Sequence, residues 1–520
     1  MSVARARGGW GRTATTTAAF AVLLAVVGAV AGPTWDPVPV PEQLRVSVTD
    51  TSIAGAEGTT PVGTHDVVTE RVVLTIGDDD VDATVRSPAG VAGTPGVVFV
   101  HGAGTKESDK AFVGQAVALA SAGVTTVVPA KRPEFSSLRH RDYEEMARDY
   151  AAAVAYLRTL PTVVPDRVGV YAESEGTWIA PLMARDDPTL AFVALVSAPV
   201  VPPRAQAAFA VDSYLRNTGV PESVFRAIPR AVGMELPGGG IDYADFDVDP
   251  YLPALQMPVL VAYGTDDSSM PVVQGTRDII SALTTAGNGD VLVRFYGGAN
   301  HGIKVDGRLS PAFAADLTGW VLGLPETGSG TPRVAGAQPF QRYLALDVPA
   351  PHWFGSGDTV LIIVLVGLSL VGAGGVITAA MRVRDRRRVV PRAERGVDGV
   401  VARQLVLLPV LALVTLAGLV AYLVAIARLA VDYERDAWVV WGGWFAVRLV
   451  GLAVLVVAAV LVERVIDHRA GTREALELGE EPPRVLVRGR AAWCATGATV
   501  AGTSIVVLIL AYWGVYQLGI

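Results

Sequence analysis

Four long stretches, almost free of charge, constrain how the C-terminal part of this 520-residue chain can fold. About 20 apolar residues in a helix cross a bilayer core, and in lipid the backbone must satisfy its own hydrogen bonds. Each stretch is long enough, so we expect four transmembrane helices within residues 358–520. Arg448 is the one charged residue in the third, where it either snorkels, packs against a neighbouring helix or has a functional role. The stretches are Thr359–Met381, Leu405–Ala427, Ala437–Val462 and Ala491–Ile520.

Arginines are concentrated in two of the three connecting loops, whereas residues 428–436 between them are short and slightly acidic. Loops rich in Lys and Arg remain in the cytoplasm. The pattern therefore predicts a multi-pass protein of the cytoplasmic membrane, with the C-terminus and the region before the spans outside. The first loop holds Arg382, Arg384, Arg386, Arg387, Arg388, Arg392, Arg395 and Arg403, and the second holds Arg464, Arg469, Arg473, Arg484, Arg488 and Arg490.

Residues 1–32 have the pattern of an export segment. Arg5, Arg7 and Arg12 precede an apolar centre from Ala18 to Ala31, and the small residues 29–31 are suited to cleavage. A removed signal peptide and a retained signal anchor are both compatible with this pattern, and either would export the region that follows.

Residues 66–325 have the pattern of an α/β domain. Two strand-like segments, 71–76 and 81–86, flank Gly77-Asp78-Asp79-Asp80 and predict an antiparallel hairpin. Apolar strands then alternate with helical segments, which predicts a mostly parallel sheet covered on both faces. We expect a small cap at 198–257 and linkers at 33–65 and 326–357. The predicted strands are 96–100, 124–128, 168–172, 192–197, 258–263 and 291–296.

Ser174 follows one of these strands and precedes a helical segment, so its hydroxyl lies at the apex of a sharp turn. A nucleophile elbow requires small residues two positions before and two after the serine, and Ala172 and Gly176 meet that need. The alternative is a serine that caps the following helix.

Three other strands end in residues that complete this chemistry. His101-Gly102-Ala103-Gly104 follows the first, Asp266 and Asp267 follow another, and His301 follows the last. Serine, acid and histidine thus appear in the order that α/β-hydrolases use. Each motif also has a purely structural alternative: residues 101–104 could form an ordinary tight turn, the aspartates could cap a loop, and His301 could be a polar loop residue.

With these motifs, residues 65–325 resemble bacterial α/β-hydrolase esterases related to dienelactone hydrolases and to the catalytic domain of prolyl oligopeptidases. The resemblance rests on Asp166–Val170, Ser174-Glu175-Gly176 and Asn300-His301-Gly302. The chain departs from it at Ala172, where glycine is more frequent, at Glu173, where histidine is usual, and at Thr177, where glycine is usual. The resemblance implies an α/β-hydrolase fold and ester hydrolysis. It assigns catalysis to Ser174, Asp267 and His301, with Asp267 selected over Asp266 by its spacing from Gly264, and oxyanion contacts to the N–H groups of Ala103 and Glu175.

Composition excludes several other classes. The net charge of −7 and the lack of a basic patch with interleaved aromatic residues argue against nucleic-acid binding, and the single Cys494 rules out an intrachain disulfide or a Cys-ligated metal site within one chain. We expect no cofactor and no metal. The resulting hypothesis is a membrane-anchored, extracytoplasmic serine hydrolase that acts on a small-molecule or lipid ester beside membrane lipid. The alternatives are an envelope acyltransferase with the same acyl-enzyme and a non-catalytic membrane binding module.

Overall fold

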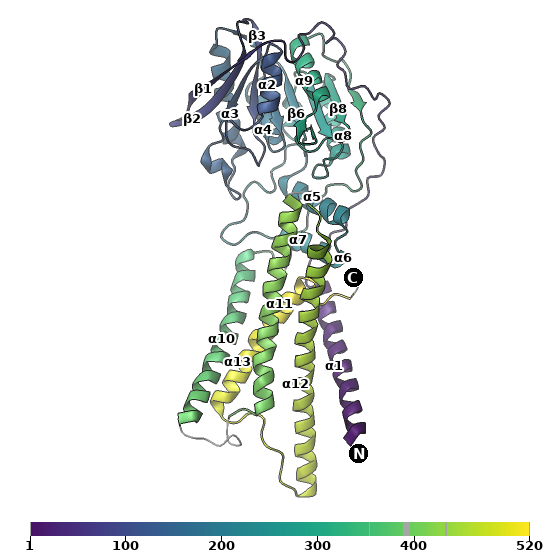
Figure 1. Cartoon of the computed structure of the whole chain (residues 1–520), viewed down its shortest axis with the longest axis vertical. Coiled ribbons are helices and arrows are strands. Elements are labelled where there is room, and N and C mark those ends of the chain that lie inside the picture. The colour runs from purple at the N-terminus through teal and green to yellow at the C-terminus, as the bar shows by residue number, and fades with distance from the viewer. Residues whose placement is uncertain (1, 353, 388–395, 432–433, 519–520) are drawn as a thin grey trace. The chain divides into compact units, whose positions relative to one another are not determined.

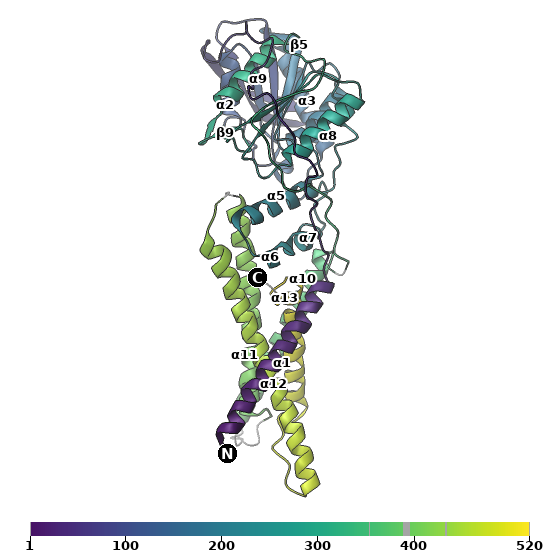
Figure 2. The same ribbon diagram turned by 90° about the vertical axis from the view of Figure 1, so that its right-hand side faces the viewer.

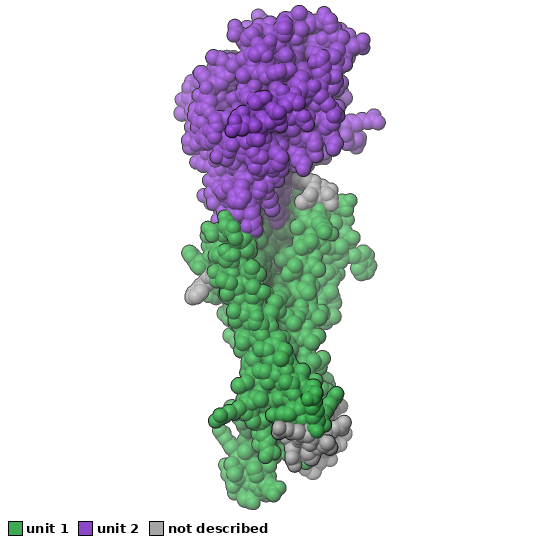
Figure 3. Space-filling model, turned by 90° about the vertical axis from the view of Figure 1, so that its left-hand side faces the viewer, with its two compact units in different colours: residues 1–35, 214–239, 349–520 green, residues 36–213, 240–348 purple. Residues whose placement is uncertain are grey.

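The computed structural model describes residues 2–352, 354–387, 396–431 and 434–518. The chain divides into two compact units, which are coloured separately in Figure 3. Unit 2 comprises residues 36–213 and 240–348, and unit 1 comprises residues 1–35, 214–239 and 349–520.

Unit 2 is built on a nine-stranded sheet in the order β1-β2-β4-β3-β5-β6-β7-β8-β11 (Figure 1). The hairpin pairs antiparallel, β2 pairs antiparallel with β4, and all remaining pairs are parallel. The mostly parallel sheet that the sequence predicts is therefore confirmed. The strands are β1 (Val67–Ile76), β2 (Asp79–Pro88), β3 (Thr94–Val100), β4 (Thr125–Pro129), β5 (Val163–Glu173), β6 (Val193–Val196), β7 (Val259–Gly264), β8 (Val291–Tyr296) and β11 (Arg333–Gly336).

Helices cover both faces of this sheet (Figure 1). Residues of α3 (Tyr143–Thr159), α4 (Gly176–Asp186) and α8 (Val272–Thr285) share one hydrophobic cluster, which also contains Val98 and Val170. Residues of α2 (Val113–Ser121) and α9 (Pro311–Gly323) share the other, which contains Phe99 and Tyr171. Successive side chains of a strand point to opposite faces, so a sheet buried on both sides needs continuous apolar runs.

Both segments that were expected to be linkers form ordered contacts within unit 2. The segment 326–357 supplies β11, which pairs parallel with β8. Within 33–65, Val40 N donates to Arg342 O (3.1 Å) and Gly336 N donates to Val48 O (2.8 Å), and Ile53 is buried. Proline and glycine content predicts irregular backbone here, but it does not reveal that such backbone finds partners on the edge of a sheet.

The predicted cap, residues 198–257, contains α5 (Pro203–Thr218), α6 (Glu222–Phe225), α7 (Ala227–Ala231) and a short 3-10 helix, η2 (Leu252–Ala254). Its middle part, residues 214–239, groups with unit 1, and the remainder groups with unit 2. A cap role for this segment stays a prediction.

The described residues of unit 1 contain five helices that are long and apolar enough to cross a membrane (Figure 2). The four expected spans are confirmed as long apolar helices, although the last ends at Tyr512 rather than near Ile520 because the chain turns at Gly514, with φ +87°. Arg388, Arg392 and Arg395 of the first arginine-rich loop lie outside the described residues. The helices are α1 (Ser2–Val30), α10 (Gly357–Arg387), α11 (Gly399–Val431), α12 (Trp444–Leu478), which follows a π-helical turn, η4 (Trp438–Gly443), and α13 (Arg490–Tyr512).

Helix α1 packs against α12 and α13, and polar side chains join it to α12. Thr13 and Thr16 donate to the two carboxylate oxygens of Glu463 at 2.7 and 3.0 Å. At its other end, the buried Arg230 of α7 donates to Gly28 O (2.7 Å) and lies over the ring of Tyr512, 4.7 Å from its centroid. Helix α1 is thus part of the helical bundle of unit 1.

Arg448 of α12 donates to the carbonyl oxygen of Gln517, just beyond α13. Of the alternatives open from the sequence, this contact corresponds to helix packing, since it joins α12 to the segment that follows α13.

Candidate active site

Ser174 occupies a strained turn between β5 and α4. Its φ is +56°, a left-handed conformation that is uncommon for any residue other than glycine. The turn is held from both sides, because Ser174 N donates to Val196 O (2.9 Å), and the N–H and hydroxyl of Thr177 donate to Ser174 O (2.9 and 2.6 Å). A Cβ on Gly176 would lie 2.6 Å from Val100 O, so any side chain two residues after the serine would displace the turn or β3. These are the geometric features of a nucleophile elbow.

Asp267 follows β7 and His301 follows β8, and the parallel pairing of these strands brings the two loops together. Asp267 Oδ2 lies 2.8 Å from His301 Nδ1, so this nitrogen donates its proton to the carboxylate. The other carboxylate oxygen accepts from the N–H and hydroxyl of Ser269 at 3.0 and 2.6 Å. Asp267 is buried, whereas the neighbouring Asp266 is exposed and its side chain has no contact with His301 among the described residues.

Two carboxylates determine the protonation of the imidazole. Burial of the His301 ring disfavours its charged form, but Asp267 and Glu173 outweigh burial and raise the pKa of His301 to about 9. Burial also favours the neutral form of Asp267, but His301 and the hydrogen bonds from Ser269 outweigh it and lower the pKa of that carboxyl. The pair therefore favours an imidazolium beside a carboxylate, which is the charge distribution that forms when a histidine takes a proton from serine.

The end of β6 connects the nucleophile loop to the histidine loop. Val196 O accepts from Ser174 N, and the next residue, Ser197, donates its hydroxyl to His301 O at 2.7 Å. Among the described residues, no hydrogen bond joins Ser174 Oγ to His301, and His301 Nε2 has no hydrogen-bond partner. Because catalytic hydrogen bonds are often long until substrate binds, a free Nε2 remains compatible with a general base.

The two predicted oxyanion donors are also unengaged. Among the described residues, neither the N–H of Ala103 nor that of Glu175 has an acceptor. The loop after β3 passes beside the nucleophile, because a Cβ on Gly102 would lie 3.2 Å from Ser174 Cβ. Two N–H groups without acceptors near a nucleophile can bind the oxyanion of a tetrahedral intermediate.

His101 anchors this loop. Its Nε2 donates to Pro129 O (2.6 Å), and its Nδ1 accepts from the hydroxyl of Thr105 (3.0 Å). Burial lowers the pKa of His101 to about 4, so the ring is neutral at physiological pH. Both ring nitrogens are engaged, which assigns His101 to positioning of the loop.

The charged side chains around Ser174 have partners that the local sequence does not indicate. The Glu173 carboxylate accepts from the hydroxyl of Tyr171 (3.0 Å), and burial raises its pKa. The Glu175 carboxylate is buried and forms ion pairs with Lys131 and Arg141. Burial lowers the pKa of the Lys131 ammonium, and Glu175 opposes that effect. Lys131 and Arg141 lie 44 and 34 residues from Glu175, so no motif spacing could have found them.

A groove of about 440 Å³ lies beside the loop after β3, within the usual size range of small-molecule sites. It is lined by eleven residues, among them Lys106, Ser108, Lys131 and Ser136, but not by Ser174, Asp267 or His301. Within the part of the chain that the structure describes, no group of three or more His, Cys, Asp or Glu residues could hold a metal ion.

Comparisons with known proteins find similarity to solved structures only. No protein-family model and no curated protein matches the chain. A dienelactone hydrolase from Anabaena variabilis is 19% identical, with 49% of this chain and 96% of that chain covered and a TM-score of 0.34. The thermophilic carboxylesterase EstE1 from a metagenomic library is 19% identical, with 51% and 90% covered and a TM-score of 0.37.

A candidate dipeptidyl aminopeptidase IV from Bacteroides ovatus is 18% identical, and the match spans 51% of this chain but only 36% of that longer chain, with a TM-score of 0.36. These values are too low to carry a functional argument. The proposal that follows therefore rests on the geometry of the site.

Proposed function

We propose that this chain is a membrane-anchored serine hydrolase that cleaves a carboxylic ester through an acyl-Ser174 intermediate. The observation that carries the proposal is the left-handed Ser174 at a strand-to-helix turn, beside two N–H groups without acceptors. A serine that only capped a helix would not need this strain, nor the Asp267–His301 pair on neighbouring strands.

The chemistry follows from the positions of these groups. Ser174 Oγ attacks the ester carbonyl carbon while His301 Nε2 accepts the hydroxyl proton. The carbonyl oxygen becomes an oxyanion that accepts hydrogen bonds from Ala103 N–H and Glu175 N–H. The leaving alcohol then takes the proton from His301 as the C–O bond breaks. Water repeats the sequence on the acyl-enzyme, which releases the acid and regenerates Ser174.

Membrane attachment forms the second part of the proposal. The four C-terminal helices and α1 are long and apolar enough to span a bilayer, and Arg230 and Glu463 bind α1 through side-chain hydrogen bonds. These contacts favour a retained signal anchor over a removed signal peptide. With the arginine-rich loops in the cytoplasm, unit 2 lies outside the cell, where a lipid or small-molecule ester is its substrate.

A fluorophosphonate probe tests the proposal on the detergent-purified full chain. This electrophile forms a tetrahedral adduct that resembles the intermediate, so it should label Ser174. Labelling should be lost in Ser174→Ala and strongly reduced in His301→Ala, and a short-chain aryl ester should be hydrolysed. Absence of labelling in folded protein would refute the enzyme and favour a binding module. Transfer of the acyl group to an added alcohol in preference to water would identify an acyltransferase.

A further inference from the structure

A buried ion cluster lies directly behind the nucleophile elbow. The carboxylate of Glu175 is paired with Lys131 Nζ at 2.8 Å and with the guanidinium of Arg141, and it accepts from the hydroxyl of Tyr143 at 3.3 Å. The side chains of Lys131, Arg141 and Glu175 are 2%, 8% and 1% exposed. Ion pairs at such depth are costly to form and are weak evidence for stability, so this cluster calls for another explanation.

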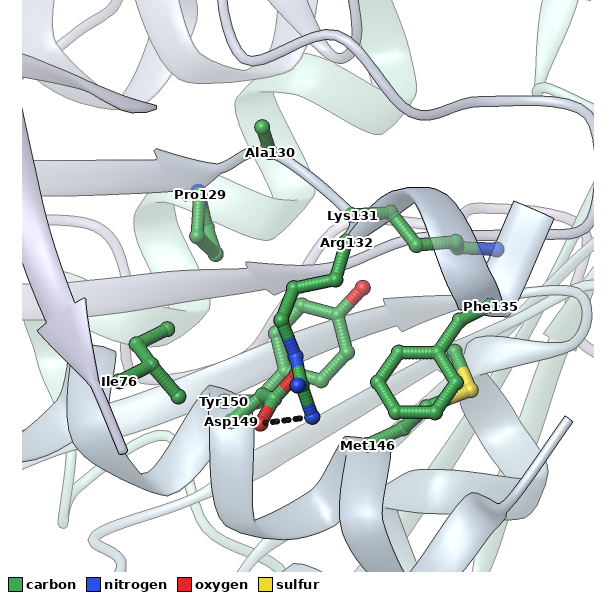
Figure 4. Close-up of a pocket in the computed structure, with 9 residues that line it drawn as sticks. All are labelled: Ile76, Pro129, Ala130, Lys131, Arg132, Phe135, Met146, Asp149 and Tyr150. Atoms are coloured by element: carbon green, nitrogen blue, oxygen red, sulfur yellow. Dashed lines mark hydrogen bonds and ion pairs between the residues drawn. The ribbon is translucent and has the colours of Figure 1, made fainter. Parts of the chain in front are cut away.

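Lys131 joins the two loops that carry the unengaged N–H groups. It follows β4, and its Nζ donates both to Glu175 Oε2 and to Gly102 O, each at 2.8 Å. Figure 4 shows that the adjacent Arg132 points elsewhere, toward Asp149, while the Lys131 side chain extends away from that pair. The two consecutive cations therefore bind different groups: Arg132 binds Asp149, whereas Lys131 binds Glu175 in the turn that carries Ser174.

The contact with Gly102 O acts on the next residue through the peptide bond. The carbonyl of Gly102 and the N–H of Ala103 belong to one planar trans peptide, so they point in opposite directions. A donor that holds the carbonyl therefore also sets the direction of the N–H. A cationic donor further polarises the amide and strengthens its N–H as a donor.

The contact with Glu175 acts on the second N–H group. The backbone N–H of Glu175 is the second predicted oxyanion donor, and ion pairs with Lys131 and Arg141 fix the side chain of the same residue. Two cations against one carboxylate leave a net positive charge behind the elbow, and this charge favours an oxyanion in front of it.

We propose that Lys131 is a positioning residue of the oxyanion hole, which holds the Gly102–Ala103 peptide and the Glu175 side chain so that both N–H groups meet the oxyanion. This inference rests on the proposed hydrolase function. Lys131 itself does not touch the substrate carbonyl, so its loss should weaken binding of the transition state more than binding of the substrate.

The test compares Lys131→Met with Lys131→Arg in the detergent-purified full chain. An aryl ester gives kcat and KM, and a trifluoromethyl ketone, which forms an oxyanion on the serine, gives the affinity for a transition-state analogue. Removal of one oxyanion donor costs about 10²- to 10³-fold in kcat, so loss of a positioning residue should cost about 10- to 100-fold. We expect that loss in kcat and in ketone affinity for Lys131→Met, with KM nearly unchanged and partial recovery in Lys131→Arg.

Lys110→Met is the matched control, because Lys110 is exposed in the loop after β3, and it should behave as wild type. If Lys131→Met fails to fold, Lys131→Met combined with Glu175→Gln removes both charges of the pair and should show the same loss in kcat. A folded variant without Lys131 that keeps wild-type kcat and ketone affinity, or that changes only KM, would overturn the inference. Absence of wild-type labelling at Ser174 would instead refute the proposed function itself.

Discussion

The glycine two positions after the nucleophile offers the sharpest test of the elbow. A Cβ at Gly176 would lie 2.6 Å from Val100 O and 3.1 Å from Val100 Cγ1. Ordinary van der Waals contact begins at 3.4 Å, so Gly176→Ala must move the elbow away from β3 by about 0.8 Å. That movement separates Ser174 from the loop that carries Ala103 N–H.

The expected effect has two parts. Overpacking of this kind costs about 1–3 kcal/mol of folding stability. A displacement of about 1 Å in a reacting group costs about 10²-fold in rate. We therefore expect Gly176→Ala to remain folded with a lower Tm and to lose about 10- to 100-fold in kcat/KM for an aryl ester.

Gly169→Ala separates the two parts. Its Cβ would lie 2.4 Å from Phe192 O, so the clash is similar, but the residue lies five positions before Ser174 in β5. Tm should fall while kcat/KM of the folded fraction stays near the wild-type value. Gly58→Ala, whose Cβ meets open space, should change neither. Wild-type kcat/KM in Gly176→Ala, or an equal loss in Gly169→Ala, would refute the reasoning.

Three further predictions concern the base, the acid and the membrane. A general base must be neutral, and the pKa of His301 is raised to about 9, so the rate of Ser174 labelling should rise with pH through a midpoint above 6.5. Glu173→Gln removes a negative charge that raises the pKa of His301, so it should lower this midpoint. A wild-type midpoint at or below 6.5 would contradict the prediction. Asp267→Asn should reduce kcat by about 10⁴-fold with the fold intact, whereas Asp266→Asn should be mild, and the reverse ranking would reassign the acid. A reporter fused after residue 330 should report the outside of the cell, and a cytoplasmic signal there would invert the proposed topology.

Much of the fold could be predicted because it depends on local patterns. The four C-terminal helices of membrane-spanning length follow from stretches almost free of charge whose length matches a bilayer, and the fifth such helix among the described residues, α1, lies in the segment expected to be a signal peptide or a signal anchor. All strands of the sheet except β11 follow from local sequence patterns, and Ser174, His101 and His301 lie just after the ends of three of them. The order of these motifs along the chain predicts one common edge, because the carboxyl ends of parallel strands lie together.

Other features escaped prediction because their partners are distant in the sequence. Proline-rich composition marked 326–357 as a linker, yet the backbone of β11 pairs with β8. Arg230 carries no helical or strand pattern that would indicate a contact with Gly28, 202 residues earlier. Composition indicates the conformation that a segment favours by itself. These contacts depend instead on hydrogen-bonding groups of a distant segment that folding brings close.

The sequence by itself determined the order of the motifs from which serine-hydrolase chemistry is predicted, since a glycine-rich turn, a serine, an acid and a histidine each follow an apolar strand. The resemblance to a known family favoured Asp267 over Asp266 by its spacing from Gly264, but only the tertiary structure shows the contact, because strand pairing buries Asp267 against His301 and leaves Asp266 in solvent. It alone also brought Lys131 to Gly102 and Glu175. The physical reason is that hydrogen bonds and ion pairs act over about 3 Å, and only folding brings groups from separate strands within that distance.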